Sequence, residues 1–141
     1  MDKFAVDYSL YLVTDSTPAI LGSRNLADIV EAAIRGGVTI VQYRDKALPR
    51  NEQIRVARGL HAVTSQYGVP LLINDSVDIA AEVGCEGAHV GQDDMNILEA
   101  RKILGPEKIL GVSAGTVQEA VTAAKNGADY IGIGAIFATP T

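Results

Sequence analysis

The sequence predicts an α/β fold in which helices cover a parallel sheet. Six short apolar runs rich in β-branched residues alternate with five segments of helical spacing. The runs are apolar at consecutive positions, as expected for strands buried on both faces. Polar residues follow the end of each run. Because a closed barrel brings these ends to one rim, we expect a (β/α)8 TIM barrel, of which 141 residues cover about six strands and five helices.

The first strand is expected at residues 8–14. The first helix is expected at residues 26–34, where apolar side chains recur at i, i+3, i+4 and i+7. A glycine pair at residues 36–37 ends this helix, since glycine adopts the left-handed conformation at little cost. A second strand at residues 38–43 then leads into a helix that ends at Gly68.

The later elements follow the same order. The remaining strands are expected at residues 70–74, 88–90, 109–113 and 130–133, and the remaining helices around residues 77–83, 97–104 and 117–124. The last helix should bury Val117, Ala120, Val121 and Ala124. An open doubly wound sheet is the competing architecture. No glycine-rich fingerprint follows the first strand, which counts against a dinucleotide-binding domain, and residues 1–141 are expected to form part of one barrel domain.

The composition is that of a core-forming globular protein, with 48% hydrophobic residues and a net charge of -5. The acidic balance argues against a nucleic-acid partner. No apolar run reaches the roughly 18 residues of a membrane span, and the N-terminus lacks the pattern of a signal peptide. Cys85 is the only cysteine and is expected to be buried. We therefore expect a cytoplasmic protein that does not contact a membrane.

A cluster of polar and charged residues ends the second predicted strand, at residues 42–46. Since alternate residues of a strand face one side, Gln42, Arg44 and Lys46 should project together. An amide, a guanidinium and an ammonium suit a polyanion. The alternative is a solvated loop in which Arg44 or Lys46 pairs with Asp45. The position after an apolar strand favours a binding site at the barrel mouth.

Carboxylates follow the next two strands. Asn74 and Asp75 end the third strand, and Asp93 and Asp94 follow the fourth. Either pair could alternatively cap the helix that comes after it. Adjacent strand ends would bring Asp75 and Asp94 close enough to share one hard cation, and Mg²⁺ prefers few carboxylates together with water and substrate phosphates. The sequence therefore predicts a magnesium–diphosphate site on this rim.

No Ser/His/Asp or Cys/His set for a protein nucleophile stands out. His89, in the fourth strand, is expected to be a hydrogen-bonded core histidine. After the sixth strand, Thr139 and Thr141 offer hydroxyls, and Pro140 stiffens the loop between them.

Five ordered segments resemble one known family. They read GGVTIVQYRDK at residues 36–46, PLLIND at 70–75, AHVGQDDM at 88–95, ILGVS at 109–113 and GADYIGIG at 127–134. In this order they are similar to the motifs of the thiamine-phosphate synthases, and the likeness runs from about residue 11 to residue 141. The chain thus resembles the N-terminal part of the synthase domain.

The resemblance implies a transferase built on a TIM barrel. It would join 4-amino-5-hydroxymethyl-2-methylpyrimidine diphosphate to hydroxyethylthiazole phosphate, giving thiamine phosphate and diphosphate. The implied substrate-binding residues are Gln42, Tyr43, Arg44, Asp45, Lys46, Asn74 and Ser113 for the pyrimidine, and Thr139, Pro140 and Thr141 for the thiazole phosphate. The implied Mg²⁺ ligands are Asp75 and Asp94, and the implied catalytic residues are Arg44, Lys46 and Ser113. The implied mechanism is dissociative: diphosphate leaves, and the thiazole nitrogen attacks a stabilised pyrimidine cation.

Some positions depart from the family pattern. Ser76 replaces the arginine that many members carry, and Ala135 and Ala138 replace two prolines. The ATPT form of residues 138–141 is more similar to the fungal bifunctional proteins, which continue into a hydroxyethylthiazole kinase domain. The lysine and the last two strands that usually follow are missing, so an incomplete barrel is expected.

Two alternatives to the synthase remain. A related thiazole tautomerase barrel needs no diphosphate grip, and the retained charged residues disfavour it. A catalytically incompetent fragment would expose strand edges that invite association. The expected partners are the two small-molecule substrates, without nucleic acid. Assembly into a homo-oligomer and a C-terminal thiazole kinase domain are left open.

Overall fold

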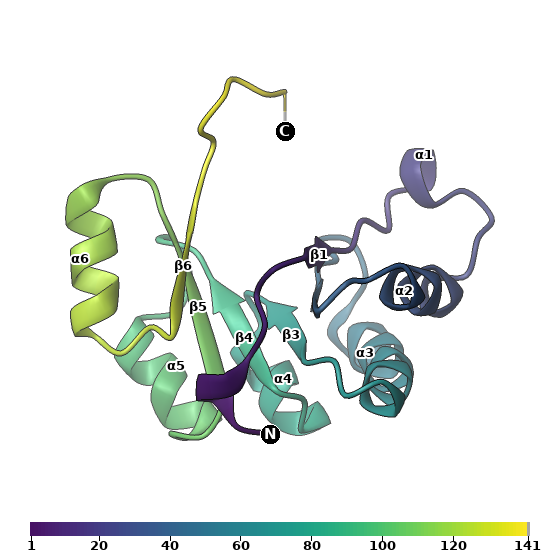
Figure 1. The fold of residues 1–141 in the computed structure, drawn as a ribbon, viewed down its shortest axis with the longest axis horizontal. Helices are drawn as coiled ribbons and strands as arrows, with labels where there is room; N and C mark the ends of the chain where they lie inside the picture. The colour runs from purple at the N-terminus through teal and green to yellow at the C-terminus, as the bar shows by residue number, and fades with distance from the viewer. Residues whose placement is uncertain (141) are drawn as a thin grey trace.

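Six parallel strands form one curved sheet in the computed structural model, which describes residues 1–140 (Figure 1). The strands are β1 (Tyr11–Val13), β2 (Ile40–Tyr43), β3 (Leu71–Asn74), β4 (Gly87–Val90), β5 (Ile109–Ala114) and β6 (Tyr130–Ile133). Their order in the sheet is their order in the chain. Such a sheet belongs to a barrel, because the order of a doubly wound sheet reverses at a switch point. The expected fold class is confirmed.

Helices cover the outer face of the sheet, one in each crossover (Figure 1). They are α2 (Leu26–Arg35), α3 (Arg50–Gln66), α4 (Val77–Val83), α5 (Ile97–Leu104) and α6 (Val117–Lys125). Side-chain caps fix several of their starts. Asn25 accepts the backbone N–H of Asp28 at 3.2 Å, and Thr116 accepts that of Glu119 at 3.1 Å. These bonds satisfy N–H groups that the first helical turn leaves without partners.

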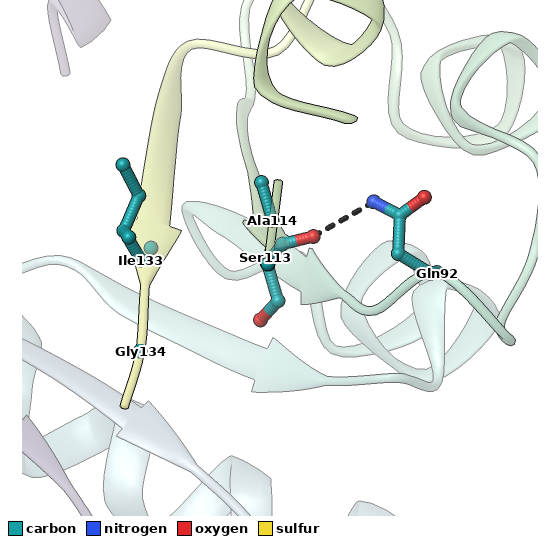
Figure 2. A pocket seen from close by; sticks show the side chains of 7 residues that line it. Gln92, Ser113, Ala114, Ile133 and Gly134 are labelled. Carbon is teal, nitrogen blue, oxygen red and sulfur yellow. Dashed lines mark hydrogen bonds between the residues drawn. The ribbon is translucent and has the colours of Figure 1, made fainter. Parts of the chain in front are cut away.

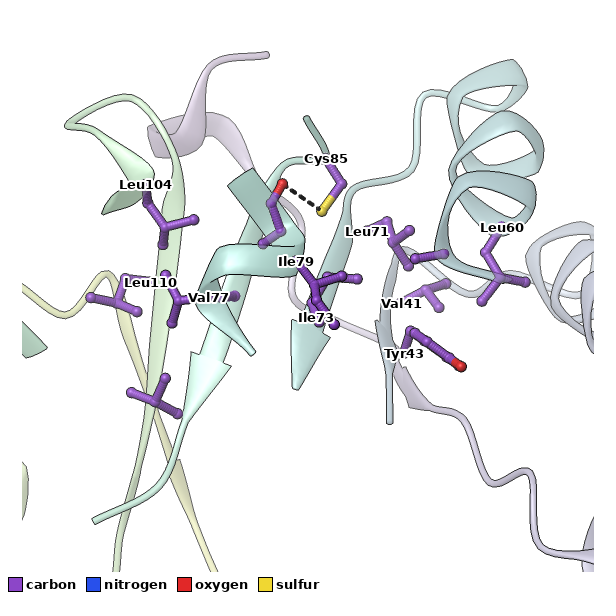
Figure 3. Packing of buried hydrophobic residues seen from close by; sticks show 14 of the residues in the cluster. Val41, Tyr43, Leu60, Leu71, Ile73, Val77, Ile79, Cys85, Leu104 and Leu110 are labelled. Carbon is purple, nitrogen blue, oxygen red and sulfur yellow. Dashed lines mark hydrogen bonds between the residues drawn. The ribbon is translucent and has the colours of Figure 1, made fainter. Parts of the chain in front are cut away.

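The main core lies between the sheet and the helices (Figure 3). Strand residues such as Val41 and Leu71 face the helices and are fully buried. The alternate residues of the same strands face the concave side, where Ile40, Leu72 and Ile109 form a smaller apolar cluster. The strands are therefore apolar on both faces near their N-terminal ends, which is why their sequences lack a simple alternation.

The structure differs from the predicted elements near the N-terminus. β1 is shorter than expected because the chain bends at residues 9–10, where the Asp7 carboxylate accepts the Ser9 N–H at 2.9 Å. The loop after β1 contains an additional short helix, α1 (Pro18–Leu21), and a 3-10 helix (Lys3–Ala5) precedes the strand. Residues 1–140 thus contain six α-helices rather than five.

The buried face of α6 also differs from the prediction. Ala123 is 1% exposed, whereas Val117 is 81% exposed, Val121 is 42% exposed and Ala124 is also exposed. This helix has apolar residues on two faces, so its spacing did not decide which one packs inward. The helix contacts β5 and β6 and buries Ala123, whose small side chain allows a close approach to the sheet.

Cys85 is buried, as predicted. Its Sγ lies 3.6 Å from the carbonyl oxygen of Gly87, and burial raises the pKa of the thiol to about 11, so the group stays uncharged. Within residues 1–140, none of the helices has the length and apolar character needed to cross a bilayer.

Candidate active site

The C-terminal end of β2 carries the predicted polyanion-binding set. Gln42 is 4% exposed, and its Nε2 donates to the hydroxyl of Tyr11 at 2.9 Å. Arg44 lines the same cavity as Gln42, and its guanidinium has no hydrogen bond or ion pair with any described residue. The Lys46 ammonium forms an ion pair with Asp75. The alternative of a loop in which Arg44 or Lys46 pairs with Asp45 is therefore wrong.

Tyr43 and Asp45 have structural contacts. Tyr43 is 1% exposed and packs between the sheet and the helices (Figure 3). The Asp45 Oδ1 accepts the backbone N–H of Ala47 at 2.8 Å and that of Leu48 at 3.0 Å, which shapes the loop after β2. Neither residue lines the cavity that Gln42 shares with its neighbours. A direct substrate contact remains a prediction for both.

Asp75 follows β3 with a φ of 63°, in the left-handed region that residues other than glycine seldom adopt. Its N–H donates to the carbonyl of His89 at 2.8 Å, which holds the turn against β4. Ser76 is the N-cap of α4 and makes no side-chain cap, so the helix-cap alternative is wrong for Asp75. The carboxylate meets Lys46 instead. Backbone strain that projects a charged group in this way is typical of functional positions.

Asp94 lies in the loop after β4. Its Oδ2 accepts the backbone N–H of Gly91 at 2.6 Å. Asn96 caps α5 by accepting the N–H of Leu98 at 2.9 Å, so neither Asp93 nor Asp94 caps that helix. The Asp94 carboxylate is left at the rim of the sheet.

The carboxylates of Asp75 and Asp94 interact with one another, and their pKa values shift in opposite directions. Burial acts to raise the pKa of Asp75, but the hydrogen bonds from Lys46 and Asp94 outweigh it and lower the pKa. Burial and the adjacent Asp75 together raise the pKa of Asp94. Ionisation of Asp94 is therefore disfavoured beside the Asp75 carboxylate, and a cation bound between the two groups would relieve this effect. No third acidic, histidine or cysteine side chain completes a cluster with them in the part of the chain that the structure describes.

A cavity of about 640 Å³ opens on the concave face of the sheet. Its polar lining includes Gln42, Arg44, Asn74, His89 and Ser113. These side chains come from four strand ends and the loop after β2, and four of the five were predicted as binding residues. The volume falls within the range of small-molecule sites, which is roughly 300–1,000 Å³.

A second hollow of about 390 Å³ adjoins Ser113, which lines both spaces. Figure 2 shows Ser113 and Ala114 of β5 between Gln92 on one side and Ile133 on the other. The Gln92 Nε2 donates to the carbonyl oxygen of Ser113 at 2.8 Å. Sequence analysis did not single out Gln92, because nothing in its local pattern indicates that its loop returns to β5.

Three residues of the larger cavity were missed or assigned elsewhere. Tyr11 and Tyr130 had no predicted role, and His89 was expected in the core. His89 is indeed hydrogen-bonded and only 9% exposed: its Nδ1 lies 2.8 Å from the Tyr130 hydroxyl and its Nε2 2.7 Å from Ser113 Oγ. It nevertheless lines the cavity. The register of the strands could have predicted these positions, because His89 pairs with Asn74 and Tyr130 pairs with Gly111.

The predicted thiazole-phosphate residues lie at the end of the chain. Thr139 and Pro140 are exposed in the segment that follows β6 (Figure 1), and Thr141 lies outside the described residues. The two cavities are not lined by Thr139 or Pro140. Their role remains a prediction.

Known proteins are similar to this chain in sequence and in fold. The sequence model of a family described as thiamine monophosphate synthase matches residues 10–141. The curated thiamine-phosphate synthase of Clostridium novyi (strain NT) is 50% identical over 136 residues, or 96% of this chain and 66% of that protein. The corresponding protein of Ruminiclostridium cellulolyticum is 49% identical over 139 residues, or 99% of this chain and 65% of that protein.

A solved structure agrees with these matches. A thiamine phosphate pyrophosphorylase from Pyrococcus furiosus superposes with a TM-score of 0.83 at 35% identity, over 92% of this chain and 61% of that one. The chain therefore spans slightly less than two thirds of the length of the curated relatives that it matches. The finer likeness to fungal bifunctional proteins remains a prediction, since none of these three relatives is a fungal protein.

Proposed function

Because this chain belongs to the thiamine monophosphate synthase family, we propose that it couples 4-amino-5-hydroxymethyl-2-methylpyrimidine diphosphate with hydroxyethylthiazole phosphate. The products would be thiamine phosphate and diphosphate. The observation that carries the proposal is the ion pair between Lys46 and Asp75, since it joins the cationic end of β2 to the acidic end of β3. A diphosphate bound through a divalent cation needs both kinds of charge at one rim.

Arg44 and Lys46 would hold the leaving diphosphate. The Arg44 guanidinium borders the larger cavity without a hydrogen bond or ion pair to any described residue, so its donors are available to phosphate oxygens. Lys46 is 56% exposed at its side chain and can exchange its contact with Asp75 for one with a phosphate. Together the two cations would stabilise the negative charge that grows on the leaving group.

We further propose that Asp75 and Asp94 hold Mg²⁺. The residues fit this ion, because both are hard oxygen donors and they interact with one another. Burial and the adjacent Asp75 raise the pKa of Asp94, and a divalent cation would relieve both effects. A site with only two carboxylates suits Mg²⁺, which keeps several waters and takes further oxygens from substrate phosphates. When bound, the ion would neutralise charge on the diphosphate.

The pyrimidine would occupy the cavity of about 640 Å³. Asn74 has a side-chain amide without a hydrogen bond to the described residues, and Ser113 offers a hydroxyl from β5. Gln42 would reach the same ligand from β2. Thr139, Pro140 and Thr141 are proposed to meet the thiazole phosphate, on the strength of the family motif.

The proposed chemistry needs no protein nucleophile. The bond between the pyrimidine methylene carbon and the diphosphate oxygen breaks, and the diphosphate keeps the electron pair. The lone pair of the thiazole nitrogen then forms the new C–N bond. The chain would contribute positioning and charge stabilisation through Arg44, Lys46 and Ser113. His89 agrees with this division of roles, because both of its ring nitrogens are already hydrogen-bonded.

The alternatives are less well supported. A thiazole tautomerase binds no diphosphate, so it would not need the Lys46–Asp75 pair or the unpartnered Arg44 guanidinium. We place the protein in the cytoplasm, with small-molecule substrates and no nucleic-acid partner. Homo-oligomer formation and a following thiazole kinase domain remain predictions.

The test supplies the purified chain with both substrates and follows thiamine phosphate by mass spectrometry, with and without Mg²⁺. We expect Mg²⁺-dependent product and at least about a tenfold loss of kcat/KM in Arg44→Ala, since this removes a charged contact with the diphosphate. Arg58→Ala is the matched control, because Arg58 lies on α3 with one long contact of 3.9 Å to Glu82.

Two other outcomes separate the alternatives. Isomerisation of the thiazole without coupling would support the tautomerase. Absence of turnover with retained, Mg²⁺-dependent binding of the pyrimidine diphosphate would identify an incompetent fragment, and absence of both would contradict the proposed site.

A further inference from the structure

Five side chains form one hydrogen-bonded chain across the concave face. The Gln42 Nε2 donates to Tyr11, the hydroxyls of Tyr11 and Tyr130 are hydrogen-bonded, Tyr130 contacts His89 Nδ1, and His89 Nε2 contacts Ser113 Oγ. The members come from β2, β1, β6, β4 and β5. We infer that the hydrogen bonds of this series all point in one direction, from Gln42 to Ser113. In this arrangement His89 is a positioning residue that makes the Ser113 hydroxyl a donor toward the cavity.

The direction is set at Gln42. An amide nitrogen can only donate, so the Tyr11 oxygen accepts this bond. The remaining partner of the Tyr11 hydroxyl is Tyr130, to which its proton must therefore point. Burial raises the pKa of both phenols, so each keeps the proton that the chain requires at neutral pH.

The same logic carries the direction through the imidazole. Tyr130 already accepts from Tyr11, so its own proton points to Nδ1 of His89. A ring nitrogen that accepts a hydrogen bond carries no proton, so the imidazole is neutral in this arrangement. A neutral imidazole that accepts at Nδ1 carries its proton on Nε2, which then donates to Ser113 Oγ at 2.7 Å.

Ser113 is the last member of this series of hydrogen bonds. Its oxygen accepts from His89, and its own proton has no acceptor among the described residues. The hydroxyl lines both cavities. It therefore presents a donor, and it should select an acceptor atom of the ligand, such as an unprotonated nitrogen of an aromatic ring. If the ligand is the pyrimidine of the proposed function, on which this last step rests, the acceptor is a ring nitrogen.

Glycines in the surrounding strands leave room for the rings of these hydrogen-bonded side chains. A Cβ atom at Gly111 would lie 2.1 Å from Cζ of Tyr130, and one at Gly132 would lie 3.4 Å from Cε1 of His89. The Tyr130 ring also packs against the ring of Tyr8, with centroids 5.0 Å apart. Glycine at these inward positions thus admits two rings where other strand residues would displace them.

The opposite direction makes a different prediction. If the Gln42 amide presented its oxygen to Tyr11, every bond of the chain would reverse. His89 would then carry its proton on Nδ1, and Ser113 would donate to Nε2 and offer the cavity only an acceptor. The tautomer of His89 therefore separates the two directions without any ligand.

The experiment is long-range ¹H–¹⁵N correlation on the ligand-free, ¹⁵N-labelled chain at neutral pH. The chain has two histidines, and His61→Gln assigns the spectrum, since His61 contacts Glu86 at 2.9 Å rather than the cavity. We expect the Nε2–H tautomer for His89. The Nδ1–H tautomer or an imidazolium would overturn the inference, and because this readout uses no substrate, it stands apart from success or failure of the proposed coupling.

Variants then test the positioning role. Tyr130→Phe should mix the two tautomers of His89 and weaken binding of the pyrimidine diphosphate about threefold to tenfold in calorimetry, as loss of one oriented hydrogen bond implies. Tyr11→Phe, one step further along the chain, should act in the same direction and serves if Tyr130→Phe does not fold. Tyr67→Phe is the control, because the Tyr67 hydroxyl donates to Glu31 at 2.8 Å and does not line either cavity. A changed tautomer with unchanged affinity, or an equal effect of Tyr67→Phe, would overturn the positioning role.

Discussion

The ammonium of Lys46 forms an ion pair with the carboxylate of Asp75, which joins the loop after β2 to the turn after β3. The contact helps to lower the pKa of Asp75 against the opposing effect of burial. In the absence of a metal ion, Lys46 therefore supplies the positive charge that this rim of carboxylates needs. The pair is exposed enough to exchange, since the two side chains are 56% and 27% exposed.

Replacement of Lys46 should separate metal binding from diphosphate binding. Lys46→Met removes the ammonium but keeps the length of the side chain. Affinity for Mg²⁺ alone should stay the same or rise up to about fivefold, because an exposed ion pair that competes for Asp75 contributes at most about 1 kcal/mol. Affinity for the pyrimidine diphosphate should fall, because one cationic contact is lost.

Titration calorimetry with each ligand checks this prediction. Lys102→Met on α5 is the control, since Lys102 is exposed and forms no ion pair within the described residues. A parallel loss of affinity for both ligands in Lys46→Met would show that Lys46 does not compete for the metal site.

Asp129 should stabilise the fold between β5 and β6. Its carboxylate accepts from Arg101 Nη2 at 2.7 Å and from the Leu110 N–H at 2.8 Å, and it lies 3.0 Å from the ammonium of Lys3. Asp129→Asn should lower the free energy of unfolding by about 2 kcal/mol, because charged hydrogen bonds are lost at a largely buried position. Urea denaturation at pH 7 measures this loss.

The pH dependence gives a second readout for Asp129. Burial opposes ionisation, but the hydrogen bond from Arg101 and the further contacts outweigh it, so the pKa of Asp129 is lowered. A lowered carboxyl pKa contributes stability above the unfolded value of about 3.9, and that contribution is lost as the pH falls through the folded pKa. Asp129→Asn should therefore flatten the fall of stability in this acid range, whereas Glu107→Gln, at an exposed loop position, should leave it unchanged.

Two glycine replacements should have opposite effects. Gly59 lies in the interior of α3, and no atom lies within 4 Å of the place that a Cβ would occupy there. Gly59→Ala should therefore stabilise the chain by about 0.5–1 kcal/mol through helix propensity. Gly111→Ala should destabilise it, because the new Cβ would overlap the Tyr130 ring. Thermal unfolding of both variants checks the signs, and a neutral Gly111→Ala would mean that the Tyr130 ring can move aside.

The sequence was sufficient for the order of elements and for part of the site. Parallel strands in sequence order place their C-terminal ends together, so Asp75 and Lys46 could be expected to meet although they are 29 residues apart. The buried face of α6 was harder to predict. Val117 and Val121 looked like the core of α6, but that helix is apolar on two sides and the sheet selects the smaller residues.

The interior of the curved sheet was the least predictable part of the site. Tyr11 and Tyr130 are hydrogen-bonded across 119 residues of sequence, and no local pattern reports a contact between inward-facing side chains of β1 and β6. The side of Tyr43 was similarly undetermined until the register of β2 was known, since a shift by one residue exchanges the faces of a strand.

Direct measurement of Mg²⁺ binding in the presence of inorganic diphosphate tests the central claim that Asp75 and Asp94 form one metal site beside Lys46. Calorimetry should show at least about tenfold weaker binding in Asp75→Asn and in Asp94→Asn, because each removes a carboxylate ligand, with little change in Asp93→Asn as the neighbouring control. Unchanged affinity in Asp75→Asn and Asp94→Asn, or an equal loss in Asp93→Asn, would contradict the assignment.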